Sequence, residues 1–60
     1  MMNPKEKLRY IMRYGKLILK DGQWTWTAAP DFDFEVSTVS TASRWSTVDV
    51  VYDYIRKIKK

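Results

Sequence analysis

Hydrophobic and polar residues alternate on both sides of the dipeptide Asp21-Gly22. This dipeptide favours a two-residue hairpin turn, because both of its residues tolerate the positive φ that the turn requires. We therefore predict a hairpin over about residues 16–28. Its apolar face consists of two cross-strand pairs, Leu17 with Trp26 and Leu19 with Trp24. A slip of one residue would mix the apolar and polar faces, so the pattern and the turn predict the same register, with both tryptophans in a core.

The first residues carry the signals of a helix start. Asn3 is a favourable N-cap, Pro4 suits the first helical position, and Glu6 follows three residues after the cap. Gly15 is suited to end this helix. The apolar residues between these signals fall at helical spacing and are Leu8, Ile11 and Met12.

A third strand is predicted after Ala29-Pro30, since proline cannot donate a hydrogen bond to a sheet. Apolar and acidic residues alternate in it, with Phe32, Phe34 and Val36 on one face and Asp31, Asp33 and Glu35 on the other. These carboxylates lie about 6–7 Å apart along a strand and would share a metal ion poorly. We expect them to pair with Lys16 or Lys20, or to protect an edge strand. The Ser/Thr-rich segment 37–47 is predicted to extend this strand at its start and then to form a loop.

The last helix is predicted to begin at Ser46, because Ser46 and Asp49 form a capping-box pattern. Trp45 stands immediately before this cap and is expected to pack against Val50 or Val51. The helix carries a continuous apolar stripe, made of Val48, Val51, Tyr52, Ile55 and Ile58.

These elements predict a small α+β domain that spans residues 1–60 in the order helix, three strands, helix. The simplest layered arrangement packs both helices on one face of a three-stranded antiparallel sheet. The same order occurs in double-stranded-RNA-binding domains. Their lysine-rich entry to the last helix is replaced here by the residues 45–49, so the likeness is one of element order alone.

The composition excludes several kinds of chemistry. The chain has no cysteine and no histidine, which removes disulfides, thiolate zinc sites and the commonest general base. It also lacks a glycine-rich phosphate loop and a paired-carboxylate cleft. We therefore expect a non-enzymatic binding protein with no cofactor, no metal and no small-molecule substrate. No stretch is apolar enough for a secretory signal or a membrane span, so a cytoplasmic protein is expected.

The distribution of basic residues favours nucleic acid as a partner. The formal net charge is +4, a modest bias toward polyanions. A row with a spacing of three or four residues runs along the first helix and could contact phosphates: Lys5, Arg9, Arg13 and Lys16. A second basic group stands at the end of the last helix: Arg56, Lys57, Lys59 and Lys60. The alternative interpretation of both groups is a solvated surface, with cations that complement the helix dipole.

A second hypothesis is that the chain binds another protein. Three tyrosines lie beside or at the edge of the predicted apolar stripes, and exposed tyrosine is favoured at interfaces: Tyr10, Tyr14 and Tyr54. In this interpretation the protein is a small regulator or inhibitor, of the kind found as accessory proteins of phages and plasmids, and acts through tyrosines or a sheet edge. A homodimer is a further alternative, because so short a chain buries little surface on its own.

Overall fold

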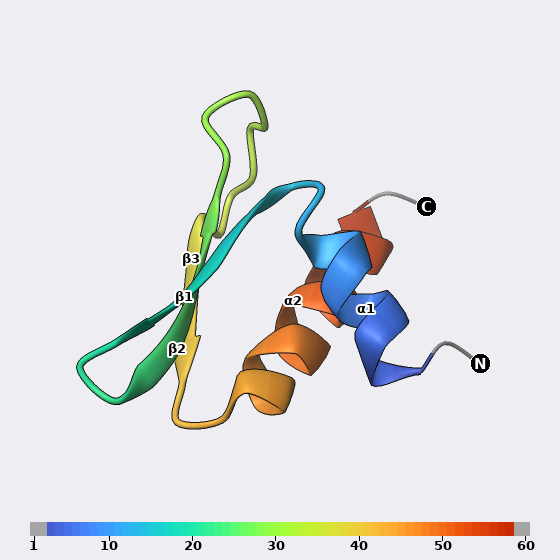
Figure 1. Ribbon diagram of the computed structural model, residues 1–60. Coiled ribbons are helices and arrows are strands. Elements are labelled where there is room, and N and C mark those ends of the chain that lie inside the picture. Colours follow the sequence, from blue (N-terminus) through green and yellow to red (C-terminus); the bar gives the residue numbers. More distant parts are fainter. Residues whose placement is uncertain (1–2, 59–60) are drawn as a thin grey trace.

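A computed structural model of the chain describes residues 3–58. Its elements follow the predicted order. They are α1 (Pro4–Ile11), β1 (Gly15–Lys20), β2 (Gln23–Ala28), β3 (Thr38–Thr41) and α2 (Arg44–Ile58). The strands form one antiparallel sheet in the order β1-β2-β3, and both helices lie on the same side of it (Figure 1). The predicted α+β fold is therefore confirmed.

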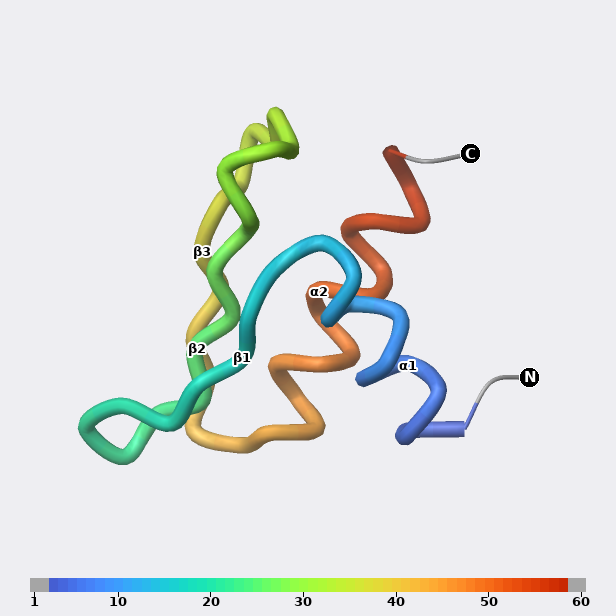
Figure 2. The backbone as a smooth tube through the Cα atoms, turned by 45° about the horizontal axis from the view of Figure 1, so that its top comes forward, coloured from blue at the N-terminus to red at the C-terminus, as the bar shows by residue number. Residues whose placement is uncertain are grey.

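The hairpin has the predicted register. Leu17 pairs with Trp26 and Leu19 with Trp24, and both turn residues have positive φ values, 52° at Asp21 and 78° at Gly22. The prediction that both tryptophans lie in a core is confirmed for Trp26, which is fully buried, whereas Trp24 is only half-buried. Leu19, on the same predicted apolar face, is 57% exposed. The reason is that the turn end of the hairpin extends beyond the helices (Figure 2).

The first helix begins as predicted but ends earlier. The side chain of Asn3 accepts a hydrogen bond from the backbone N–H of Glu6. The helix ends at Ile11 with Met12 as its C-cap, so the prediction that Gly15 ends it is wrong. Gly15 opens β1 instead, where a Cβ atom would collide with the carbonyl oxygen of Thr27 and with the Trp26 ring.

The third strand lies later in the chain than predicted. Residues 31–37 form a loop, and the strand is Thr38–Thr41, within the Ser/Thr-rich segment. Pairing with β2 places Val39 opposite Trp26, and the hydroxyls of Thr25 and Ser40 lie 2.9 Å apart across the pair. Cross-strand hydroxyl and β-branched pairs of this kind stabilise a sheet. Phe32 and Phe34 are not part of the sheet and pack in an aromatic cluster, Phe32 on Tyr14 and Phe34 on Tyr14, Trp26 and Tyr54.

The last helix begins at Arg44, two residues before the predicted start. Its first backbone bond runs from the N–H of Thr47 to the carbonyl of Ser43, 3.1 Å away. The predicted capping box is wrong, because Ser46 lies inside the helix and not at its N-cap. The neighbouring Thr47 is buried, and its hydroxyl donates to the carbonyl of Trp24 at 2.8 Å. Asp49 pairs with Lys7 of α1 instead.

The core lies between the sheet and α2. Trp26 is fully buried, and its indole N–H donates to the carbonyl of Ile11 at 3.1 Å, which ties the sheet to the end of α1. The predicted stripe of α2 is buried except for Ile58, which is half exposed. The buried apolar residues are Ile11, Trp26, Val48, Val51, Tyr52 and Ile55.

Candidate basic interface

The outer side of α1 carries the first part of the basic row. On its inner side, Lys7 Nζ lies 3.1 Å from the Asp49 carboxylate, and the Tyr10 ring lies 5.3 Å from the Tyr52 ring. In each pair the residue of α2 stands 42 positions after its partner in α1. The same offset at two successive positions means that the two helices run in parallel (Figure 1). Lys5 and Arg9 are four residues apart on α1, and both are exposed. Side chains with this spacing are neighbours on a helix surface.

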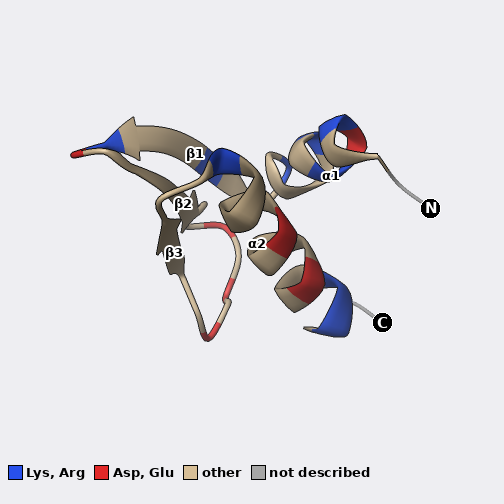
Figure 3. Ribbon diagram, turned by 90° about the horizontal axis from the view of Figure 1, so that it is seen from below, with Lys and Arg blue, Asp and Glu red and all other residues tan. Residues whose placement is uncertain are grey.

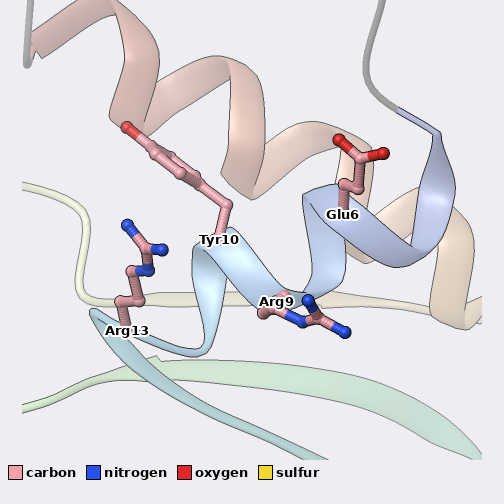
Figure 4. A pocket seen from close by; sticks show the side chains of 4 residues that line it. All are labelled: Glu6, Arg9, Tyr10 and Arg13. Carbon is pink, nitrogen blue, oxygen red and sulfur yellow. The ribbon is translucent and has the colours of Figure 1, made fainter.

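An open hollow of about 400 Å³ lies at the end of α1. It is lined by Glu6, Arg9, Tyr10 and Arg13. Arg13 follows the helix in a turn, and Figure 4 shows its guanidinium directed toward the Tyr10 ring. The Glu6 carboxylate points away from both guanidinium groups (Figure 4) and accepts a hydrogen bond of 3.0 Å from the Asn3 amide. The hollow is therefore lined by two arginines, one glutamate and one half-buried aromatic ring.

Neither arginine of this hollow is neutralised by a carboxylate. Within residues 3–58 there is one ion pair, and it joins Lys7 to Asp49. The acidic loop 31–35 lies apart from α1 itself (Figure 3), although its Phe32 packs on Tyr14, which follows Arg13 in the chain. Guanidinium groups without a carboxylate partner keep all their donors available for a phosphate or carboxylate ligand.

One basic residue of α2 contacts Tyr52, the ring on which Tyr10 packs. Arg56 donates to the Tyr52 hydroxyl at 3.4 Å and lies 5.6 Å from the Tyr52 ring, beside which Tyr10 packs. The pKa of Tyr10 is raised, mainly by burial and then by the neighbouring hydroxyl of Tyr14, while the positive charge of Arg56 opposes this shift. Arg56 therefore acts on the same tyrosine that lines the arginine hollow.

The other predicted basic residues are dispersed. Lys5 lines a separate hollow near the start of α1. Lys16 is exposed on β1, and Lys57 is exposed near the end of α2. Lys59 and Lys60 lie outside the described residues. The structure thus brings together Arg9 and Arg13 beside Tyr10, with Lys5 one helical turn away from Arg9, while Arg56 contacts Tyr52.

Within residues 3–58, no group of acidic side chains is placed to hold a metal ion, and no helix is long and apolar enough to cross a membrane. Comparison with protein-family models, curated proteins and solved structures finds no match to this chain. A functional assignment therefore depends on the chemistry of the surface itself.

The three tyrosines predicted as a protein interface are half-buried in an aromatic cluster. Tyr14 contacts Tyr10 at a ring distance of 5.4 Å and Phe32 at 5.0 Å. Tyr54 packs on Phe34, and its hydroxyl accepts the backbone N–H of Val36 at 2.9 Å. Tyr14 and Tyr54 thus contact the loop 29–37, while Tyr10 packs on Tyr14 and Tyr52. The role of the three tyrosines in binding a partner stays a prediction.

Two residues near the basic surface were not predicted from the sequence as functional residues, Arg44 and Trp45. The Arg44 guanidinium lies 4.4 Å from the Trp45 ring and 5.6 Å from the Trp24 ring. Trp45 is 37% exposed and borders the same hollow as Lys5. The signal in the sequence is an arginine next to a tryptophan. The helix start predicted at Ser46 places both residues in a loop, so the sequence does not show that Trp45 lies near Lys5.

Proposed function

We propose that this protein binds nucleic acid through the outer side of α1, with Lys5, Arg9 and Arg13 in contact with phosphates. Lys16 and Arg56 support this surface from its margins. The observation that carries the proposal is the pair of arginines in one hollow, Arg9 and Arg13, which have no carboxylate partner within residues 3–58.

The chemistry of these side chains suits a phosphate backbone. A guanidinium group presents a planar set of donors that matches phosphate oxygens, and it remains charged at any physiological pH. Phosphate contacts of this kind position a protein on nucleic acid without reading its sequence. We therefore expect weak binding that tolerates changes of sequence.

The test is a fluorescence-anisotropy titration of labelled short nucleic acids at low salt and at about 0.15 M salt. The probes are a DNA duplex, an RNA duplex and a DNA single strand. Three phosphate contacts predict a slope of about −3 for log affinity against log salt on duplex DNA. The Arg9→Ala/Arg13→Ala double variant should reduce that slope to about −1.

The matched control is Lys20→Glu, which changes the net charge by the same amount as the double arginine variant. Lys20 is exposed at the turn end of the hairpin, far from α1 (Figure 1). If Lys20→Glu weakens binding as much as the double variant, only overall charge matters and the α1 surface is not the site. The proposal fails outright if no probe binds even at low salt.

A second candidate function is supported by one observation on the sheet. β1 is an edge strand, and its side chains Ile18 and Leu19 are 51% and 57% exposed. An unpaired edge with exposed apolar residues can accept a strand from another protein. If no nucleic-acid probe binds in the titration, this sheet edge is the next surface to test.

A further inference from the structure

Trp45 is the tryptophan that the structure leaves most exposed. It stands at the second position of α2 and is 37% exposed, whereas Trp26 is fully buried and Trp24 is half-buried. The guanidinium of Arg44 lies 4.4 Å from its ring. A tryptophan in this position offers a large aromatic surface that the core does not use.

The ring borders a hollow of about 420 Å³ between the first turns of the two helices. The other lining residues are Asn3, Pro4 and Lys5. Its volume falls within the range of about 300–1,000 Å³ that is typical of small-molecule pockets. The lining combines an aromatic wall with a cation, and it contains no carboxylate.

We propose that this hollow binds an unpaired nucleic-acid base, stacked on Trp45, while Lys5 contacts the adjacent phosphate. The proposal rests on the proposed function and names its substrate class, which is single-stranded nucleic acid. A base inside a duplex is stacked between its neighbours and cannot enter the hollow. The Trp45 hollow therefore discriminates between the two forms of nucleic acid, and the arginine hollow does not.

Two features of the structure connect this hollow to the arginine surface. Lys5 lines the Trp45 hollow, and Arg9 lines the arginine hollow. The two residues are separated by one turn of α1, a rise of about 6 Å. A single strand can therefore follow the outer side of α1 from Trp45 toward Arg13. Proteins that bind single strands without sequence preference combine a basic track with aromatic stacking platforms in this way.

The experiment compares two strands of equal length and equal charge, one of oligo-deoxythymidine and one with abasic sites. Both are titrated by anisotropy against the wild-type protein. Stacking of one base on an aromatic ring predicts about tenfold tighter binding of the thymidine strand. Because this comparison uses the wild-type protein, it does not depend on the folding of any variant.

Variants then test whether the preference for the thymidine strand depends on Trp45. Trp45→Ala should remove the tenfold preference, and Trp45→Phe should retain most of it because the ring is kept. Leu19→Ala is the matched control, since it removes an exposed apolar side chain at the far end of the hairpin and should change nothing. Duplex binding should be unaltered in all three variants.

The outcomes separate this inference from the proposed function. Equal affinity for the thymidine and abasic strands, with binding still weakened by Arg9→Ala/Arg13→Ala, overturns base stacking and leaves phosphate binding in place. A preference that survives in Trp45→Ala also overturns it, because another ring must then hold the base. Absence of salt-dependent binding to every strand overturns both proposals.

Discussion

The hairpin and the segment that follows it show the same alternation of apolar and polar residues, yet only the hairpin forms strands from it. In the hairpin, Asp21 and Gly22 adopt positive φ values and fix the register from within. In residues 31–36 no turn brings a second strand alongside. Phe32 and Phe34 pack instead on Tyr14, at ring distances of 5.0 and 6.0 Å. Alternation thus specifies a strand only where a turn or a neighbouring strand supplies partners for the backbone.

The largest expected effect comes from Trp26, where the two regions meet. Its ring lies 6.1 Å from Phe34, and its backbone pairs with Leu17 on one side and Val39 on the other. Trp26→Ala should lower the free energy of unfolding by about 3–5 kcal/mol, which is comparable to the whole stability of a domain of this size. Urea denaturation followed by circular dichroism measures this.

The control for Trp26→Ala is Leu19→Ala on the same face of the hairpin. Because Leu19 is exposed, its replacement should cost less than about 0.5 kcal/mol. Equal losses in the two variants would contradict the placement of the core.

The two glycines of the hairpin should differ in their tolerance of side chains. In Gly15→Ala the new Cβ would lie 2.7 Å from a carbon of the Trp26 ring and against the Thr27 carbonyl, so we expect a loss of about 1–3 kcal/mol. Gly22 has open space around it but a φ of 78°, so Gly22→Ala should cost about 1–2 kcal/mol.

Asparagine distinguishes the two causes, since it tolerates positive φ but occupies more space than alanine. Gly22→Asn should recover most of the stability that Gly22→Ala loses, whereas Gly15→Asn should recover none. Thermal unfolding of the four variants gives the comparison. Recovery at both positions would show that Trp26 does not pack against Gly15.

The smallest expected effect is confined to the loop 29–37. Tyr54→Phe keeps the ring on Phe34 but removes the hydroxyl that accepts the Val36 N–H at 2.9 Å. The loss of this hydrogen bond should cost about 0.5–1.5 kcal/mol. Amide hydrogen exchange should accelerate at Val36 and remain unchanged at Ile18 and Thr25, which pair in the hairpin. Faster exchange in the hairpin as well would show that loop and hairpin open together.

Features with local causes could be predicted from the sequence. The hairpin register follows from the turn residues, the start of α1 from Asn3 and Pro4, and the buried stripe of α2 from helical spacing. The position of β3 could not be predicted, because Phe32 lies outside the sheet and packs on the ring of Tyr14, a residue from a distant part of the chain.

In the candidate site, too, features with local causes could be predicted and features that depend on distant parts of the chain could not. Spacing along one helix was sufficient to place Lys5 and Arg9 on a common side of α1. The contacts of Arg56 and of Tyr10 with Tyr52 depend on how α2 packs against α1, which no local pattern records. Trp45 was missed for a similar reason, since its place beside Lys5 depends on the true start of α2.

The parallel alignment of α1 and α2 has a consequence for the order of folding. The sheet joins segments that are adjacent in the chain, through a two-residue turn and the loop 29–37. The helix pair joins Lys7 to Asp49 across 42 residues. Closing a long loop costs more entropy than closing a short one, and contacts distant in sequence slow folding. We expect the sheet to assemble first and the helices to dock last, so weakening the Lys7–Asp49 contact should accelerate unfolding and leave the folding rate almost unchanged.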